Sequence, residues 1–275
     1  MEIAFYGDKF VDINEKVIPI QERGHQFGDG IYEVIRVYNG TPFLLNEHLE
    51  RLENSAKAIM LQLPTTIEEL KQIINEGLQK TEFTEVEIYI QITRGIAPRA
   101  HLFPTVSSEL SMTFKNARIV DKDKREKGVT VTLMEDERWK NCYIKSLNLL
   151  PNVLAKQKAA SEGHEEAILV RDGFITEGSS SNIFVVKEGT LYTTPASIQI
   201  LHGITRAAVI KLANKMNIPF EEMKFDVSFL KQCDEAFITS TSVEVLPISK
   251  IDEVELSADR PIVDTLKVEF QNLYL

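Results

Sequence analysis

The feature that most constrains the fold is a strand that runs into an unusually clear turn early in the chain. Residues 32–38 are rich in Val, Ile and Tyr, and Asn39-Gly40 follows them directly. Asn-Gly favours the positive φ angles of a tight hairpin, and residues 43–45 resume the strand pattern. The sequence therefore predicts a β-hairpin, and with it a sheet, in the first part of the chain.

Two amphipathic helices are predicted directly after this hairpin. The first covers residues 46–60 with Asn46 as its cap, and the second covers residues 66–79. In both, apolar residues recur every three or four positions, which places them on one helical face. Further short strands are expected over residues 2–6, 10–20, 86–93 and 110–114. Strands with two helices indicate a small α+β unit.

The second half of the chain is richer in strands. A mixed-charge run at residues 121–127 marks the expected domain boundary. Helices are expected over residues 153–162 and 205–216. The clearest strands lie over residues 129–135, 166–170, 183–187, 190–193 and 236–240. We predict a small N-terminal α/β domain over residues 1–118 and a larger, barrel-like C-terminal domain over residues 119–275.

Charge and composition exclude several classes of function. The net charge of −10 argues against nonspecific binding to nucleic acid or anionic membranes. No apolar run is long enough to cross a membrane, and the start lacks the basic and apolar regions of a secretory signal. The two cysteines, Cys142 and Cys233, provide neither a disulfide framework nor metal-ligand spacing. We expect a cytoplasmic protein without a metal site.

One lysine, Lys145, stands in an otherwise uncharged run over residues 141–150. A buried ammonium is costly unless it is paired or loses its proton. A lysine that acts as a nucleophile must be neutral, and its main use is to form a Schiff base with a carbonyl. The run alone also fits a lysine on a strand edge whose amine reaches water, but residues further along the chain favour the nucleophile.

Pyridoxal phosphate requires a lysine for its aldehyde, an acid facing its ring nitrogen and an anion site for its phosphate. Lys145 is the candidate lysine. Glu177 heads a run of small hydrogen-bonding residues, 178–182, that can approach a flat ring closely. A carboxylate there keeps the ring nitrogen protonated, because an opposite charge favours the charged form. The alternative for Glu177 is a surface glutamate in a turn.

Two segments can supply the phosphate site. Residues 203–206 lead into a predicted helix, whose first N–H groups bind anions, and the Thr205 hydroxyl can add a hydrogen bond. Residues 239–242 place a cluster of Ser and Thr at the end of a strand. Arg51, on the first predicted helix, can add the countercharge. Each segment alone also fits an ordinary helix cap or an exposed arginine.

Five motifs occur in order along the chain, at residues 24–30, 46–52, 144–148, 176–182 and 203–206. Together they resemble the class IV, fold-type IV pyridoxal-phosphate aminotransferases, over about residues 1–250. The resemblance implies a homodimer with a C-terminal pseudo-barrel domain that carries the cofactor lysine. It also implies pyridoxal 5′-phosphate as the cofactor, bound by Lys145, Glu177, Arg51, Ile204, Thr205, Ser240 and Thr241.

Residues 93–101, Thr-Arg-Gly-Ile-Ala-Pro-Arg-Ala-His, look like the segment that binds the substrate α-carboxylate in D-amino-acid aminotransferases. The planar fork of Arg99 can pair with a carboxylate, and His101 can point the same way from an extended loop. The resemblance adds the Tyr32 phenol to this site. It implies transfer of an amino group between D-alanine and 2-oxoglutarate, which gives pyruvate and D-glutamate.

Three alternative functions fit parts of the same pattern. Within the family these are a branched-chain L-amino-acid aminotransferase and an aminodeoxychorismate lyase. The third is a protein that binds pyridoxal phosphate without turnover. The pair Arg99 and His101 argues against the branched-chain enzyme, because an apolar side-chain pocket does not need these two residues.

Overall fold

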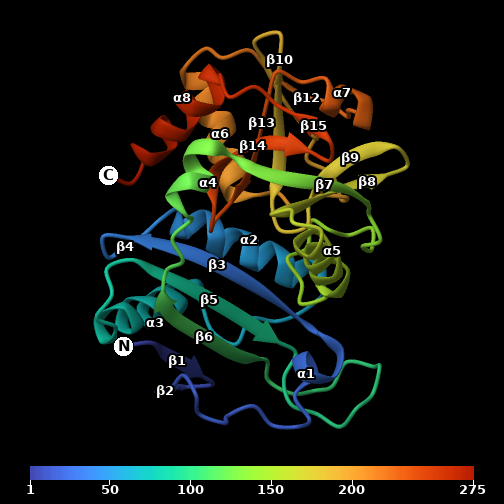
Figure 1. The fold of residues 1–275 in the computed structure, drawn as a ribbon. Coiled ribbons are helices and arrows are strands. Elements are labelled where there is room, and N and C mark those ends of the chain that lie inside the picture. Colours follow the sequence, from blue (N-terminus) through green and yellow to red (C-terminus); the bar gives the residue numbers. More distant parts are fainter. The chain divides into compact units, whose positions relative to one another are not determined.

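The computed structural model describes all of residues 1–275, which form two compact units (Figure 1). The first unit comprises Met1–Arg118 and Ile144–Asn148, and the second comprises Ile119–Tyr143 and Leu149–Leu275. No helix has the combination of length and apolarity that crossing a membrane requires.

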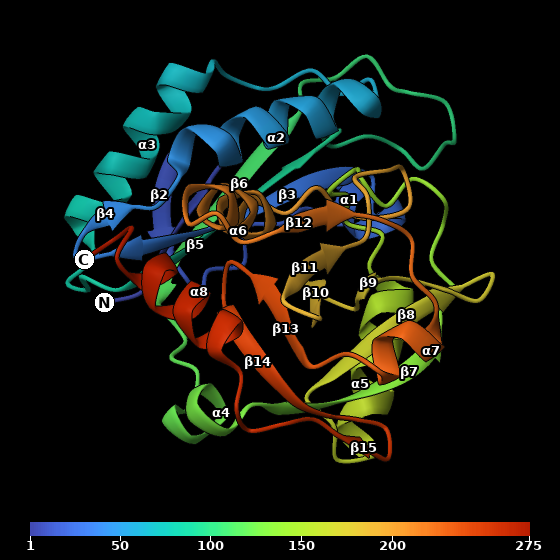
Figure 2. The ribbon, with the colours of Figure 1, turned by 90° about the horizontal axis from the view of Figure 1, so that it is seen from above.

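The first unit is built on a six-stranded antiparallel sheet with the order β2-β1-β6-β5-β3-β4. Its strands are β1 (Ile3–Tyr6), β2 (Lys9–Asp12), β3 (Gly30–Tyr38), β4 (Thr41–Pro42), β5 (Val86–Thr93) and β6 (Glu109–Asn116). Alternate residues of β3, β5 and β6 are buried, as expected when one face of a sheet meets the core. Helices α2 (Leu45–Ala58) and α3 (Ile67–Lys80) lie along that face (Figure 2).

The hairpin prediction is confirmed, but its second strand is shorter than expected. Asn39 and Gly40 both have positive φ angles, 49° and 78°. The strand does not resume over residues 43–45, because β4 ends at Pro42 and Leu44 adopts a left-handed backbone with φ of 52°. Leu44, rather than Asn46, is therefore the N-cap of α2.

Of two further predictions for this unit, the second helix is confirmed, whereas the strand over residues 10–20 is only partly correct. Helix α3 is confirmed, and Thr66 and Glu69 form a capping box at its start. The strand predicted over residues 10–20 is wrong beyond Asp12. There the Asp12 carboxylate accepts a hydrogen bond from the backbone N–H of Asn14 (2.8 Å), which turns the chain out of the sheet.

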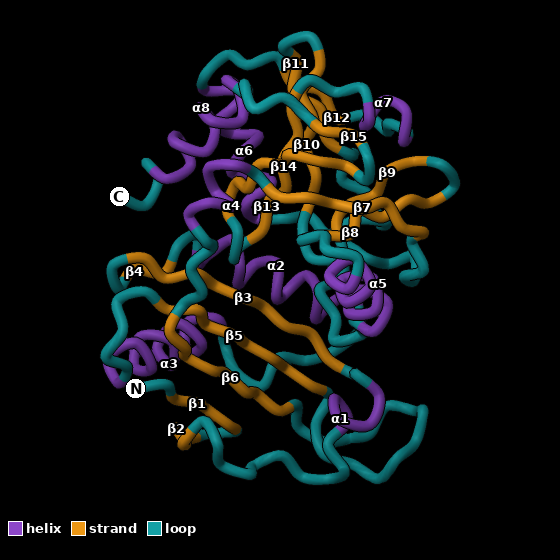
Figure 3. Tube along the Cα trace, viewed as in Figure 1, coloured by secondary structure: helices purple, strands orange, loops and turns teal.

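The second unit contains a nine-stranded sheet in the order β12-β11-β10-β13-β14-β7-β8-β9, with β15 paired to β14. Its strands are β7 (Val129–Glu135), β8 (Glu166–Arg171), β9 (Phe174–Gly178), β10 (Asn182–Lys187), β11 (Thr190–Thr193), β12 (Phe220–Glu222), β13 (Glu235–Ser240), β14 (Glu244–Ile251) and β15 (Val254–Glu255). Its helices are α4 (Lys122–Lys127), α5 (Leu150–Ser161), α6 (Ile204–Lys215), α7 (Val227–Lys231) and α8 (Pro261–Gln271). Helices α6 and α8 lie side by side next to β13 and β14 (Figure 3).

All five strands and both helices predicted for the second half are present. The charged run at residues 121–127 is largely the short helix α4, which Asp121 caps through the N–H of Asp123 (2.8 Å). Sequence reasoning missed the strands β9, β12, β14 and β15 and the helices α7 and α8.

The lysine segment packs with the first unit, not with the C-terminal domain to which the prediction assigned it. The backbone explains this. The N–H of Tyr32 donates to the carbonyl of Lys145 (3.0 Å), and the N–H of Leu147 donates to the carbonyl of Gly30 (3.0 Å). The N–H of Lys145 also donates to the Ser55 hydroxyl on α2 (3.2 Å). Residues 144–148 therefore extend the sheet at the edge of β3.

Candidate active site

Lys145 and Tyr32 contact each other in the first unit. The Lys145 Nζ lies 4.3 Å from the centroid of the Tyr32 ring, and its ammonium forms no ion pair with a carboxylate. The Tyr32 ring in turn stacks on Tyr89 of β5, with centroids 5.7 Å apart. An aromatic face stabilises a cation without fixing it as firmly as an ion pair does. The lysine predicted to be the nucleophile is thus half-buried and held by a ring.

Arg51 is held by a buried carboxylate on β3. The Glu33 side chain is fully buried and accepts hydrogen bonds from Nε and Nη2 of Arg51 (2.7 and 2.8 Å). Nδ1 of His48 lies 2.8 Å from the same carboxylate. Burial alone would raise the pKa of Glu33, but the Arg51 guanidinium lowers it to about 2. Burial lowers the pKa of His48, so the network contains a charged Glu33 and a neutral His48.

Arg99 and His101 are brought together by one aromatic ring. Phe27 ends the short helix α1 (Arg23–Phe27). The Arg99 guanidinium carbon lies 4.6 Å from the centroid of Phe27, and the His101 ring lies 5.8 Å from it. Both residues are exposed.

The three predicted substrate-binding residues therefore form two contact groups within one chain. Tyr32 contacts Tyr89 and Lys145, whereas Arg99 and His101 contact Phe27. Sequence reasoning placed the three together through the resemblance. It did not find Phe27 as the ring that Arg99 and His101 share, although Phe27 lies inside the first motif.

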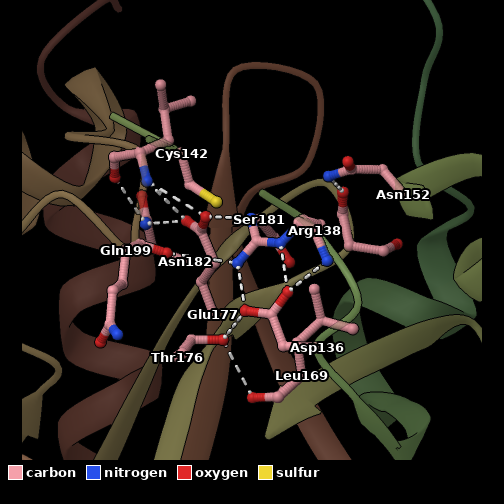
Figure 4. A network of polar contacts seen from close by, with 12 residues as sticks. Asp136, Arg138, Cys142, Asn152, Leu169, Thr176, Glu177, Ser181, Asn182 and Gln199 are labelled. Carbon is pink, nitrogen blue, oxygen red and sulfur yellow. Dashed lines mark hydrogen bonds and ion pairs between the residues drawn. The ribbon is translucent and has the colours of Figure 1, made fainter. Parts of the chain in front are cut away.

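Glu177 is the centre of a buried polar network in the second unit (Figure 4). Its carboxylate accepts hydrogen bonds from Nη1 of Arg138, Nδ2 of Asn182 (2.9 Å) and the backbone N–H of Leu201 (3.1 Å to each oxygen). Burial raises the pKa of Glu177 to about 7, while the charge of Arg138 opposes that shift. A surface glutamate in a turn would show none of these features, so that alternative is wrong.

Arg138 is fixed by a second carboxylate. Asp136 accepts hydrogen bonds from Nε and Nη2 of Arg138 (both 2.9 Å) and from the Thr176 hydroxyl (2.9 Å). Arg138 therefore lies between two carboxylates and holds Glu177 in one orientation. Sequence reasoning missed Asp136 and Arg138, since nothing in the sequence shows that Arg138 reaches Glu177, about forty residues further on.

The serine run after Glu177 is fixed by Glu166, which is buried at the start of β8. The hydroxyls of Ser179, Ser180 and Ser181 all donate to its carboxylate, the last two at 3.0 Å. This turn joins β9, which carries Glu177, to β10, which begins with the Asn182 that binds Glu177. The run thus sets the approach of Asn182 to Glu177.

The start of α6 fits an anion. Gly203 is its N-cap, and no side chain caps the free N–H groups of the first turn, which includes Ile204 and Thr205. A Cβ at Gly203 would lie 2.0 Å from Oδ1 of Asn182, so only glycine allows this close approach to the Glu177 network.

Ser240 ends β13 and Thr241 begins the turn that follows, as predicted from the strand end. The neighbouring Thr239 hydroxyl is buried and has no partner in the protein. Because α6 packs against β13, this unit supplies an acid, an uncapped helix start and a spare hydroxyl. These groups fit the ring nitrogen and phosphate of pyridoxal phosphate.

Comparison with known proteins agrees with this chemistry. The amino-transferase class IV family matches residues 30–251. The D-alanine aminotransferase of Staphylococcus haemolyticus is 45% identical over 92% of this chain and 90% of that protein. The D-alanine aminotransferase of Bacillus licheniformis is 39% identical over 100% of this chain and 98% of that protein.

Solved structures give the same fold. The branched-chain aminotransferase of Thermoproteus uzoniensis with norvaline has a TM-score of 0.90 at 27% identity, covering 99% of this chain and 94% of that one. The branched-chain amino acid aminotransferase of T.th., complexed with N-(5′-phosphopyridoxyl)-L-glutamate, has a TM-score of 0.89 at 26% identity, covering 98% and 93%. The predicted fold-type IV architecture, with its α/β unit and curled sheet, is confirmed. The chain belongs to the class IV aminotransferases.

Proposed function

We propose that this chain is a D-amino-acid aminotransferase that uses pyridoxal 5′-phosphate. It transfers the amino group of D-alanine to 2-oxoglutarate and releases pyruvate and D-glutamate. The observation that carries this proposal is the arginine and histidine pair, Arg99 and His101, on one loop and one supporting ring. Relatives named D-alanine aminotransferase are 39–46% identical over at least 92% of the chain, which supports the same assignment.

Lys145 and Glu177 carry the chemistry in this proposal. When bound, the cofactor supplies an aldehyde for covalent attachment and a ring that withdraws electrons from the substrate Cα. Lys145 provides the amine for that attachment, and its Nζ then removes the proton from the substrate Cα. Glu177 holds a proton on the ring nitrogen, since its carboxylate is aimed and charge-balanced by Arg138.

We propose that the cofactor phosphate binds to Ile204, Thr205, Ser240 and Thr241, and that Arg51 supplies the countercharge.

Arg51→Ala should weaken the affinity of the cofactor-free protein for pyridoxal phosphate by roughly tenfold or more, because a hydrogen bond between charged groups is lost. The rate in saturating cofactor should change much less. Fluorescence titration of the cofactor-free protein measures the affinity. Arg36→Ala, which removes an arginine paired with Glu85 on the same sheet, is the control. Equal affinities of Arg51→Ala and the native protein would remove Arg51 from the phosphate site.

A homodimer and two domains belong to the same proposal. We place the domain boundary between residues 118 and 119 and assign residues 144–148 to the first domain, which their place in the first unit supports. Within one chain, Tyr32 contacts Lys145, whereas Arg99 contacts Phe27. We propose that a loop from a second copy completes the substrate pocket, with both subunits in the cytoplasm.

The D preference follows from fixing the substrate at two points. Lysine and cofactor ring define one face of the substrate Cα. If Arg99, His101 and Tyr32 also fix the carboxylate, the L enantiomer can bind only with its Cα hydrogen and its side chain in swapped positions, compared with the D enantiomer. The L enantiomer then points its side chain at Lys145 and turns its Cα–H away from the base.

Arg99→Ala should lower kcat/KM for D-alanine at least about tenfold, since one charged hydrogen bond is worth about 1.5–3 kcal/mol. Cofactor content should stay unchanged. Steady-state assays over a panel of D- and L-amino acids measure the effect, and Arg118→Ala, which removes another exposed arginine of the first unit, is the matched control. Full activity of Arg99→Ala on D-alanine would contradict the assignment.

A branched-chain L-aminotransferase is the second candidate, because solved structures with that name share the fold at 26–27% sequence identity. The same substrate panel separates the two, since that enzyme would prefer L-leucine to D-alanine.

A further inference from the structure

The glycine-rich motif at residues 24–30 has no role in the chemistry described above. It forms the end of α1 and the turn into β3. We propose that Arg23 and Phe27 of this region are positioning residues that hold Arg99 and His101 in the geometry that binds a substrate carboxylate. The inference rests on the carboxylate-binding role proposed for Arg99 and His101.

Phe27 gives an exposed arginine a fixed neighbour. Arginine has many rotamers, and fixing them on binding costs conformational entropy. The Arg99 guanidinium carbon lies 4.6 Å from the Phe27 centroid, and that of Arg23 lies 4.7 Å from it. Since both guanidinium groups and the His101 ring meet the same phenyl group, Phe27 limits where Arg99 and His101 can lie before substrate arrives.

Arg23 fixes the backbone of the same loop. Its side chain is buried, and its Nη1 donates to the carbonyl of Ala100 (2.7 Å), the residue between Arg99 and His101. Its Nε donates to Asp29 (2.8 Å), a residue of the glycine-rich motif. A hydrogen bond from a charged donor is stronger than one between neutral groups, so this bond holds the loop at Ala100.

The root of the loop is attached to the same region. Asp29 also accepts from Nε of Arg94 (3.0 Å), so one carboxylate binds two arginines. The N–H of Arg23 donates to the carbonyl of Gly95 (3.0 Å), and the N–H of Ala97 donates to the carbonyl of Gln21 (3.1 Å). Residues 94–101 are therefore anchored at both ends to residues 21–29.

The other side of the motif contacts the lysine segment. Nδ2 of Asn148 donates to the carbonyl of Gly28 (3.3 Å). Gly28 has a φ of 64°, and a Cβ there would lie 3.2 Å from Oδ1 of Asn148. A Cβ at Gly30 would lie 2.5 Å from the carbonyl of Ile92. Gly28 and Gly30 therefore allow this segment to lie close to both the Lys145 segment and β5.

Phe27→Leu keeps an apolar side chain but removes the ring. We expect it to raise KM for both D-alanine and 2-oxoglutarate by about two- to fivefold, with little change in kcat. The apparent Kd for 2-methylalanine, which has a carboxylate but no Cα–H, should rise by the same factor in absorbance titrations of the holoenzyme. Phe27→Tyr should restore both values. Phe10→Leu removes a ring that contacts Lys80 instead (5.3 Å) and should leave them unchanged.

A double-mutant cycle with Arg99→Ala decides the mechanism. If Phe27 acts through Arg99 and His101, the effect of Phe27→Leu on the Kd for 2-methylalanine should become smaller once Arg99 is absent, because only the part that acts through His101 remains. An equal effect of Phe27→Leu in both backgrounds would overturn the positioning role and leave the proposed function intact. No effect of Arg99→Ala itself would instead overturn the carboxylate role, and this inference with it.

Discussion

Lys145→Ala is expected to lower the rate of transamination by at least about 10²–10⁴-fold, the range that a positioned acid or base contributes. Loss of the covalent attachment adds to this effect. Lys145 is the one lysine whose Nζ lies over the Tyr32 ring, so Lys145→Ala removes that amine from the site. The rate of a single turnover with D-alanine, measured in saturating pyridoxal phosphate, tests this expectation.

The control for this variant is Lys140→Ala, which removes an exposed lysine five residues away and should retain full activity. Borohydride reduction of the native protein should attach the cofactor to the peptide that contains Lys145. Attachment to a peptide with a different lysine would contradict the assignment of Lys145.

Glu177→Gln should produce the second-largest loss, about 10²–10³-fold in kcat, because removing one preorganised electrostatic partner has effects of that size. Glutamine keeps the shape of the side chain but not its charge, so a protonated ring nitrogen loses its counterion. Glu162→Gln, an exposed position at the end of α5, is the matched control. Unchanged turnover in Glu177→Gln would place the ring acid elsewhere.

The same variant has a pH signature that does not depend on turnover. Because burial raises the pKa of Glu177 to about 7, its carboxyl is largely protonated below that pH in the cofactor-free protein and ionised above it. Only the ionised form attracts a protonated ring nitrogen. The affinity for pyridoxal phosphate should therefore increase as the pH rises through about 7, because Glu177 becomes ionised. Fluorescence titrations at several pH values should show that Glu177→Gln lacks this increase in affinity.

The features that the sequence predicted correctly are those that neighbouring residues determine, such as turns and helix caps. The Asn39-Gly40 turn and the capped helix after Thr66 follow from backbone preferences of a few neighbouring residues. The motif residues Lys145 and Glu177 were recognisable because pyridoxal phosphate demands those groups.

Contacts between distant segments were not predictable in this way. The bond of Arg138 to Glu177 and that of Arg51 to Glu33 each join different elements, and no spacing in the chain records them. The lysine segment was assigned to the wrong unit for the same reason. Its neighbours in sequence lie in the second unit, whereas its hydrogen-bond partners, Gly30 and Tyr32, lie on β3.

The measurement that tests the central claim most directly is one half-reaction of the holoenzyme without an oxo acid. Addition of D-alanine should abolish the absorption band of the bound pyridoxal phosphate and release one pyruvate per subunit, while L-leucine should leave the band unchanged. A band that disappears with L-leucine and persists with D-alanine would contradict the D-amino-acid assignment. A band that persists with both would contradict the assignment as an aminotransferase.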